Sequence, residues 1–237
     1  YNGKDYSGVY DFSFYTGKYS DIMDNFGQDD VGALEHFVHF GMREGRQGKD
    51  TFDVYSYYRQ YADLRQIFGS DMEAYYLHYI EYGFREGRQG IGCESLQNPI
   101  TVYEGENYAD VFDFFYYTAM YADIKQAFGE DDLAALQHFV TFGMKEGRRG
   151  NEEFNVNSYR MQYEDLRRAF GDDLPAYYKH YMDYGKAEGR NGVGCNKLQG
   201  AVTVYDGMDY ASVYDYHYYV EHNPDVKAAY GLNDEAV

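Results

Sequence analysis

Histidine is the residue type in this chain best suited to chemistry near neutral pH, because an imidazole can bind a metal or carry a proton. No second histidine or cysteine recurs beside the repeated one at the spacing of a metal site. We therefore expect each repeated histidine to be structural, bonded to a neighbouring backbone group or tyrosine. Its four copies are His36, His78, His138 and His180.

Cysteines and paired aspartates are the other candidates for chemistry. Cys93 and Cys195 belong to no CxxC pair, so a free, half-buried thiol in each repeat is favoured over a disulfide between them. The acidic pairs at 29–30, 131–132 and 172–173 lack the alternating pattern of a calcium loop and are interpreted as helix caps and first-turn charges. Because these groups are copied at the repeat period, as scaffold residues are, we predict no catalytic residue, no bound metal and no cofactor.

The repeated histidines open four copies of one motif that ends in Glu-Gly-Arg. The copies read HFVHFGMREGR at 36–46, HYIEYGFREGR at 78–88, HFVTFGMKEGR at 138–148 and HYMDYGKAEGR at 180–190. Successive copies are 42, 60 and 42 residues apart, so a unit of 102 residues holds two related half-units.

This period predicts the domain organisation. The first unit is expected at 1–98, with half-units 10–50 and 51–92. A connector and the second unit are expected at 99–204, with half-units 112–152 and 153–194. Residues 205–237 would be a partial third unit and a candidate cap.

Each half-unit is predicted to form three short helices. The fifth copy defines the second helix, because Asn223 caps it, Pro224 takes its first position and Gly231 ends it. Alignment then places this helix at 20–26, 62–68, 122–128 and 164–170. The expected caps of the first helix are Asp11, Asp53, Asp113, Asn155 and Asp215, and those of the third are Asp29, Asp71, Asp131 and Asp173.

The third helix carries the repeated motif. In the first copy Leu34, Phe37, Val38 and Phe40 are expected to form its apolar face. Each glycine before the arginine is expected in the left-handed C-cap conformation, and each arginine to cover freed carbonyls or to pair with an Asp of the second helix. These glycines and arginines are Gly45, Arg46, Gly87, Arg88, Gly147, Arg148, Gly189 and Arg190.

The expected fold is therefore all-α, a tandem repeat of three-helix half-units with short β-like connectors. The connectors begin at Tyr1, Tyr103 and Tyr205, and in the second and third a β-branched run leads into a Glu-Gly or Asp-Gly pair, which suggests a small hairpin or an extended segment. The chain opens and closes within a repeat, so we expect a piece of a longer protein whose targeting signal and anchor lie outside it.

The composition limits the classes of partner. A net charge of −19 disfavours nucleic acid and anionic lipid, and no apolar run is long enough to span a bilayer. Thirty-one tyrosines with no tryptophan suit both wet cores and protein-binding surfaces.

Alignment of the half-units divides the tyrosines into two groups. Tyr75, Tyr76, Tyr79 and Tyr82 align with apolar residues and are expected in the core. Positions whose residue type varies between copies are expected to be exposed, and Tyr58→Ala is expected to weaken binding without lowering thermal stability. The candidate contact residues are Tyr55, Tyr58, Phe115, Tyr116, Tyr103, Tyr108, Tyr205 and Tyr210.

The complete repeat resembles one found in surface proteins of gut Lachnospiraceae, in particular the B-cell-superantigen immunoglobulin-binding family of the Ruminococcus gnavus type. In the first copy the residues that carry the resemblance are Asp11, Tyr15, Tyr19, Asp21, Phe26, Gly27, Asp29 and the segment from His36 to Arg46. The fifth copy departs from the pattern, because Asn223 replaces the second tyrosine and the Glu-Gly-Arg helix is lacking.

This resemblance implies binding to the Fab part of immunoglobulin and of B-cell receptors, at the framework of VH3-type heavy chains. It also implies a location on the surface of a Gram-positive bacterium or outside it. Tandem units would then raise the apparent affinity by avidity. The alternative function is an adhesin or spacer repeat that binds a glycan or a host matrix protein.

Overall fold

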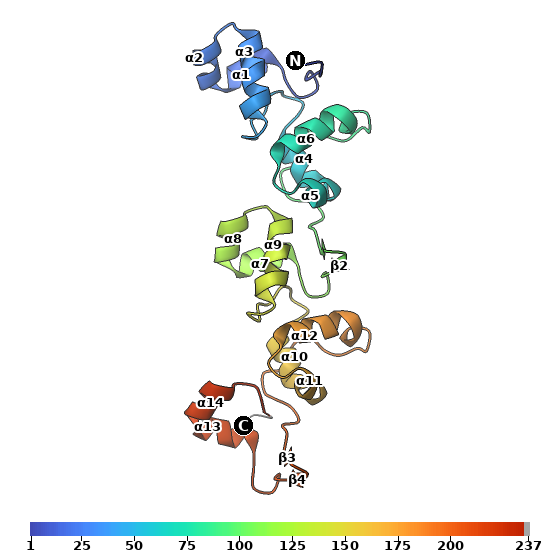
Figure 1. The fold of residues 1–237 in the computed structure, drawn as a ribbon, viewed down its shortest axis with the longest axis vertical. Helices are drawn as coiled ribbons and strands as arrows, with labels where there is room; N and C mark the ends of the chain where they lie inside the picture. The colour runs from blue at the N-terminus through green and yellow to red at the C-terminus, as the bar shows by residue number, and fades with distance from the viewer. Residues whose placement is uncertain (235–237) are drawn as a thin grey trace. The chain divides into compact units, whose positions relative to one another are not determined.

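The computed structural model describes residues 1–234 and confirms an all-α repeat protein (Figure 1). Within the described residues there are fourteen α-helices, four short π-helices and two small hairpins. The chain forms two compact units. Unit 1 comprises Tyr1–Ile100 and Glu130–Leu133, and unit 2 comprises Thr101–Gly129 and Ala134–Val237.

Unit 1 contains two successive half-units, each made of three seven-residue α-helices and a π-helical turn. The first has α1 (Phe12–Lys18), α2 (Ser20–Phe26), α3 (Asp30–His36) and η1 (Phe37–Gly41). The second has α4 (Val54–Gln60), α5 (Ala62–Phe68), α6 (Met72–His78) and η2 (Tyr79–Gly83).

The remaining helices repeat this order. The third half-unit has α7 (Phe114–Met120), α8 (Ala122–Phe128), α9 (Asp132–His138) and η3 (Phe139–Gly143). The fourth has α10 (Val156–Gln162), α11 (Glu164–Phe170), α12 (Leu174–His180) and η4 (Tyr181–Gly185). The fifth, partial half-unit has α13 (Tyr216–His222) and α14 (Pro224–Tyr230).

Side-chain caps begin most of the first and third helices of the half-units, as the sequence predicts. Asp11 accepts a hydrogen bond from the amide of Phe14, and the other four first-helix caps make the same kind of bond. Asp29 and Asp71 cap α3 and α6 in this way. Asp173 and Asn223 occupy the cap positions of α12 and α14 but accept no such bond, so the prediction of a side-chain cap is wrong at both.

The third helix of each half-unit differs from the expected regular α-helix, because it ends in a π-helical turn. In the first copy the amide of Met42 donates to the carbonyl of Phe37, five residues back. The wider turn rotates later side chains, so Met42 is buried and Phe40 is exposed. The predictions that Phe40 and Tyr82 belong to the core are therefore wrong, whereas Tyr75, Tyr76 and Tyr79 are buried as expected.

A tyrosine of the second half-unit joins the two half-units of unit 1. Tyr76 stands edge-on to Phe37, with ring centroids 5.5 Å apart, and its hydroxyl donates to the carbonyl of Arg46 at 2.8 Å. Lys4 and Glu81 add an ion pair of 2.6 Å. In unit 2 Tyr178 makes the same contacts with Phe139 and Arg148, so this junction is part of the repeat.

The connectors contain the predicted hairpins. Strand β1 (Val102–Tyr103) pairs antiparallel with β2 (Glu106–Asn107), with Val102 opposite Asn107. Strands β3 (Val204–Tyr205) and β4 (Met208–Asp209) pair in the same register. Glu104 and Gly105 both have positive φ, as a two-residue hairpin turn that follows strand twist requires.

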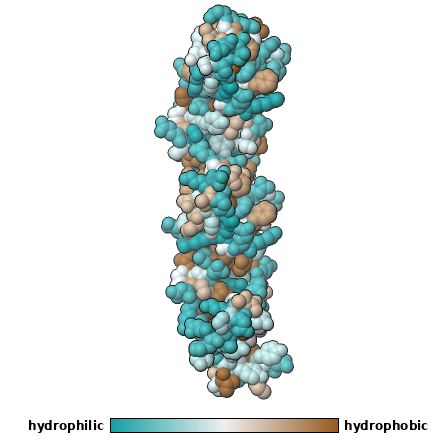
Figure 2. Space-filling model, turned by 90° about the vertical axis from the view of Figure 1, so that its left-hand side faces the viewer, coloured by the Kyte–Doolittle hydropathy of each residue, from teal (hydrophilic) through white to brown (hydrophobic). Residues whose placement is uncertain are grey.

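The apolar residues are mostly internal. The face drawn in Figure 2 is largely hydrophilic, with apolar side chains scattered over it singly or in small groups. Exposed apolar residues of this kind are ordinary on a folded protein unless their positions follow a pattern. Such a pattern exists at the π-helical turns.

Candidate binding surface

A tyrosine, a histidine and a glycine form a knot in each complete half-unit. In the first, the hydroxyl of Tyr15 and Nδ1 of His36 share a hydrogen bond of 3.1 Å. A Cβ on Gly41 would lie 2.6 Å from that hydroxyl, so only glycine fits. The equivalent tyrosine–histidine bonds are Tyr57–His78, Tyr117–His138 and Tyr159–His180. The prediction of a histidine bonded to tyrosine is confirmed.

Burial determines the protonation of this knot. It raises the pKa of Tyr15 and of its three counterparts well above the ordinary range. Burial also lowers the pKa of His78 and His138, with a smaller contribution from the positive charge of Arg88 and Arg148 respectively. In the second and third half-units these shifts favour a neutral imidazole beside a neutral tyrosine, a pair that suits a fixed helix turn.

The arginine of the Glu-Gly-Arg motif ties the end of each repeat to its second helix. Arg46 donates to Asp21 at 2.7 Å and to Glu44 at 2.6 Å, and its guanidinium lies 5.0 Å from the ring centroid of Tyr19. The prediction that it pairs with an Asp of the second helix is confirmed. The same three contacts recur at Arg88, Arg148 and Arg190.

These internal ties hold an aromatic ring in solvent at the same place in every complete half-unit. The ring follows the knot histidine by four residues and contacts it, as with His36 and Phe40 at 5.5 Å between centroids. Each of the four rings is 55–60% exposed. We call them the π-turn aromatics: Phe40, Tyr82, Phe142 and Tyr184. Alignment shows their recurrence, but the α-helical period places them in the core, so sequence reasoning missed them.

The contact residues predicted from sequence fall into three groups. Tyr55, Phe115, Tyr205 and Tyr210 are exposed, and Tyr103 and Tyr116 are half-buried. Tyr58 and Tyr108 are buried, so the exposure on which their prediction rests does not hold. Tyr58→Ala is therefore expected to lower stability, contrary to the expectation from sequence.

The burial of Tyr58 has a specific cause. Its hydroxyl donates to the carbonyl of Glu130, and its ring lies 5.7 Å from the guanidinium of Arg65. Glu130 belongs to the segment Glu130–Leu133 of unit 1. Residue types at this position vary because the two half-units use it differently, and not because it faces solvent.

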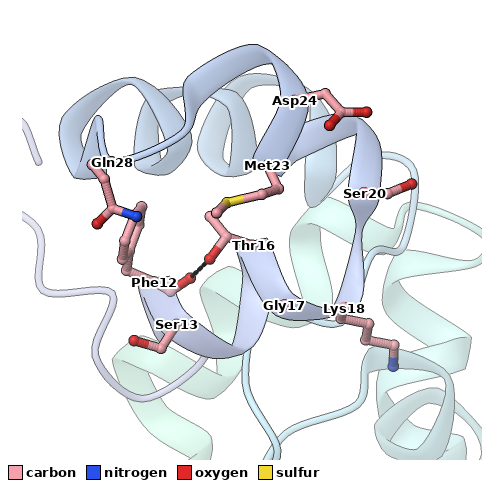
Figure 3. A pocket seen from close by; sticks show the side chains of 9 residues that line it. All are labelled: Phe12, Ser13, Thr16, Gly17, Lys18, Ser20, Met23, Asp24 and Gln28. Atoms are coloured by element: carbon pink, nitrogen blue, oxygen red, sulfur yellow. Dashed lines mark hydrogen bonds between the residues drawn. The ribbon is translucent and has the colours of Figure 1, made fainter.

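In the first half-unit Thr16 stands at the position of Tyr58, and the groove between α1 and α2 beside it is open. It has a volume of about 560 Å³, and its lining includes Phe12, Thr16, Met23 and Gln28 (Figure 3). Thr16 donates its hydroxyl hydrogen to the carbonyl of Phe12, and the polar side chains of Ser13, Lys18, Ser20 and Asp24 are also part of the lining.

Cys93 and Cys195 are both free and half-buried, as predicted. Within residues 1–234 no cluster of three or more histidine, cysteine, aspartate or glutamate side chains could hold a metal ion. Among the same residues no helix is long and apolar enough to cross a membrane. Comparisons with protein-family models, curated proteins and solved structures find no match to this chain.

Proposed function

We propose that this chain is a non-catalytic part of a bacterial surface protein that binds immunoglobulin through the VH3-type framework of Fab, as a B-cell superantigen. The choice of partner rests on the resemblance of the repeat. The observation that supports binding is the set of π-turn aromatics, because large exposed rings at one repeated position suit protein recognition.

The π-turn aromatics are the favoured contacts for two physical reasons. Each stands on a turn fixed by the tyrosine–histidine bond, so little side-chain freedom is lost on binding. Each also recurs in all four complete half-units, whereas Tyr55 aligns with Ser13 and Asn157. Repetition matters because linked sites raise the apparent affinity by ~10²–10⁴ where both can engage a receptor.

The first experiment measures binding of the full chain to separate Fab and Fc fragments, with VH3 and non-VH3 Fabs tested apart. The proposal expects retention of VH3 Fab alone. Binding to neither antibody fragment would reject it, and the alternative of a glycan or matrix ligand would follow.

A second experiment locates the contact. One variant carries serine at Phe40, Tyr82, Phe142 and Tyr184, and its matched control carries serine at the exposed aromatics Tyr55, Phe115, Tyr205 and Tyr210. Each ring lost from the contact should cost about 1–2 kcal/mol, which is roughly a five- to thirtyfold weaker Kd. Full binding by the first variant and loss by the control would move the contact to the residues predicted from sequence. Helical content measured by circular dichroism confirms that both variants are folded.

A further inference from the structure

A buried arginine–aspartate pair occurs once in each unit. In unit 1 both Arg65 and Asp132 are fully buried, with Nε and Oδ1 3.0 Å apart. The amide of Ile100 donates to the other carboxylate oxygen at 2.8 Å. The other guanidinium hydrogens reach four backbone carbonyls, those of Tyr58, Arg59, Gln97 and Asn98.

Unit 2 builds the same arrangement from its own residues. Arg167 and Asp234 lie 2.8 Å apart, and the amide of Val202 donates to the carboxylate. The guanidinium again reaches four carbonyls, those of Arg160, Met161, Gln199 and Gly200. In both pairs the aspartate follows the arginine by 67 residues. The pair is therefore a repeated element of the architecture.

Its two partners occupy different kinds of half-unit. The second and fourth half-units carry the arginine, and the first, third and fifth carry methionine or lysine there: Met23, Lys125 and Lys227. The first, third and fifth carry the aspartate, and the second and fourth carry Met72 and Leu174 instead. A contact built from this pair is consequently directional, since neither kind of half-unit can serve as both donor and acceptor.

Asp30 is the first-half-unit counterpart of Asp132 and Asp234. It is exposed, and no arginine or lysine lies within ion-pair distance of it among residues 1–234. Val31, which follows it, is 59% exposed. Asp30 is thus a carboxylate at the position where both other copies bind a guanidinium.

We propose that the surface at Asp30 and Val31 binds the second half-unit of another copy of this repeat unit, through an arginine equivalent to Arg65 and the backbone linker that follows it. Charge complementarity defines the occupant. A guanidinium held by four carbonyls keeps a strong charge-assisted bond to one carboxylate, and a lysine cannot make the same planar set of bonds. Directionality makes the docking head-to-tail.

The test joins an extra copy of residues 1–102 to Tyr1 of the full chain. This places the added arginine 67 residues before Asp30, the separation found in both existing pairs. The original Val31 is changed to Cys, and Cys93, Cys195 and the Cys93 of the added copy are changed to serine. The rate at which the single remaining thiol is labelled then reports how accessible position 31 is. In the extended chain labelling should slow by about tenfold or more, because a covered thiol reacts only when its site opens.

Substitutions of the proposed pair supply the second measurement. Asp30→Asn should leave the urea midpoint of the original chain unchanged and lower that of the extended chain. Asp24→Asn, an exposed acid on α2, is the matched control and should change neither. Changing the added arginine to Met should restore fast labelling and abolish the effect of Asp30→Asn. Equal labelling rates in both chains, or equal effects of Asp30→Asn in both, would overturn the proposal.

Discussion

The first and second half-units of unit 1 share the same internal hydrogen bonds, but the groove between their first and second helices is open in the first and filled in the second. Both have the tyrosine–histidine bond, at 3.1 and 3.0 Å, and both tie the Glu-Gly-Arg arginine to the second helix. They differ in the side chains that line the groove between the first two helices, which are α1 and α2 in the first half-unit and α4 and α5 in the second. Thr16 and Met23 leave an open groove in the first, whereas Tyr58 and Arg65 fill the equivalent space in the second.

This difference separates residues that stabilise the core of one half-unit from residues that join a half-unit to the segment that follows it. The knot and the arginine tie recur in every complete half-unit, because each half-unit needs them to close its own core. Arg65 recurs as Arg167 and alternates with Met23 and Lys125, because only every second half-unit binds the following linker. Variation with a period of two is thus a mark of an internal interface.

The largest effect on stability is expected from Arg65→Met, which gives the second half-unit the residue that the first has at this position, Met23. It leaves Asp132 buried without its counter-charge, and loss of one partner of such a pair costs about 3–5 kcal/mol. The urea midpoint should fall accordingly. Met23→Lys, an exposed change at the matched position, is the control and should be nearly neutral.

The double variant Arg65→Met, Asp132→Leu sharpens this result. Removing both charges removes the unpaired carboxylate, so the double variant should be more stable than Arg65→Met alone. Equal or lower stability of the double variant would mean that the arginine acts through its carbonyl bonds and not through Asp132.

Gly83→Ala tests the tyrosine–histidine–glycine knot that the two half-units share, and its expected effect on stability is smaller. The added Cβ would lie 2.3 Å from the hydroxyl of Tyr57, and overpacking of this kind costs about 1–3 kcal/mol. Tyr57→Phe in the same chain removes the hydroxyl and should recover part of the loss. If thermal melting shows no recovery, the glycine is required for another reason.

Protonation of the knot predicts a decline of stability in acid. The folded-state pKa of His78 lies below its ordinary value of 6.5, so the unfolded chain takes up the proton first. The contribution of His78 is complete above about pH 6.5 and is lost as the pH falls through the folded-state pKa. Urea midpoints measured from pH 8 to pH 5 should fall more gently for His78→Gln than for the parent. An identical pH profile would contradict this role, and His39→Gln is the control outside the knot.

The smallest effect on stability is expected at the π-turn aromatics. Phe40→Ser and Tyr82→Ser remove exposed rings, and surface changes of this kind usually stay within about 0.5 kcal/mol. The two half-units should respond alike in thermal melting. A large loss in either would show that the ring supports the fold and would weaken its case as a binding residue.

Most of the local structure could be predicted because it depends on local chemistry. Asp11 and its counterparts cap helices through the amides next to them in sequence, and the second helices begin and end at the predicted residues. Of the two roles predicted for Arg46, covering freed carbonyls or pairing with an Asp of the second helix, the structure shows the pair with Asp21. The exposure of Tyr58 and Tyr108 was predicted wrongly, since variability and connector position do not report tertiary contacts.

The sequence by itself determined the period, the helices, their caps and the repeated histidine and arginine, because these depend on residue spacing within a half-unit. Only the tertiary structure decided which faces are covered. It introduced a π-helical turn where Gly41 meets the hydroxyl of Tyr15, and this turned Phe40 outward. It also brought Arg65 to Asp132 across 67 residues. A contact over that separation has no signature in local periodicity, because it depends on how folded segments pack.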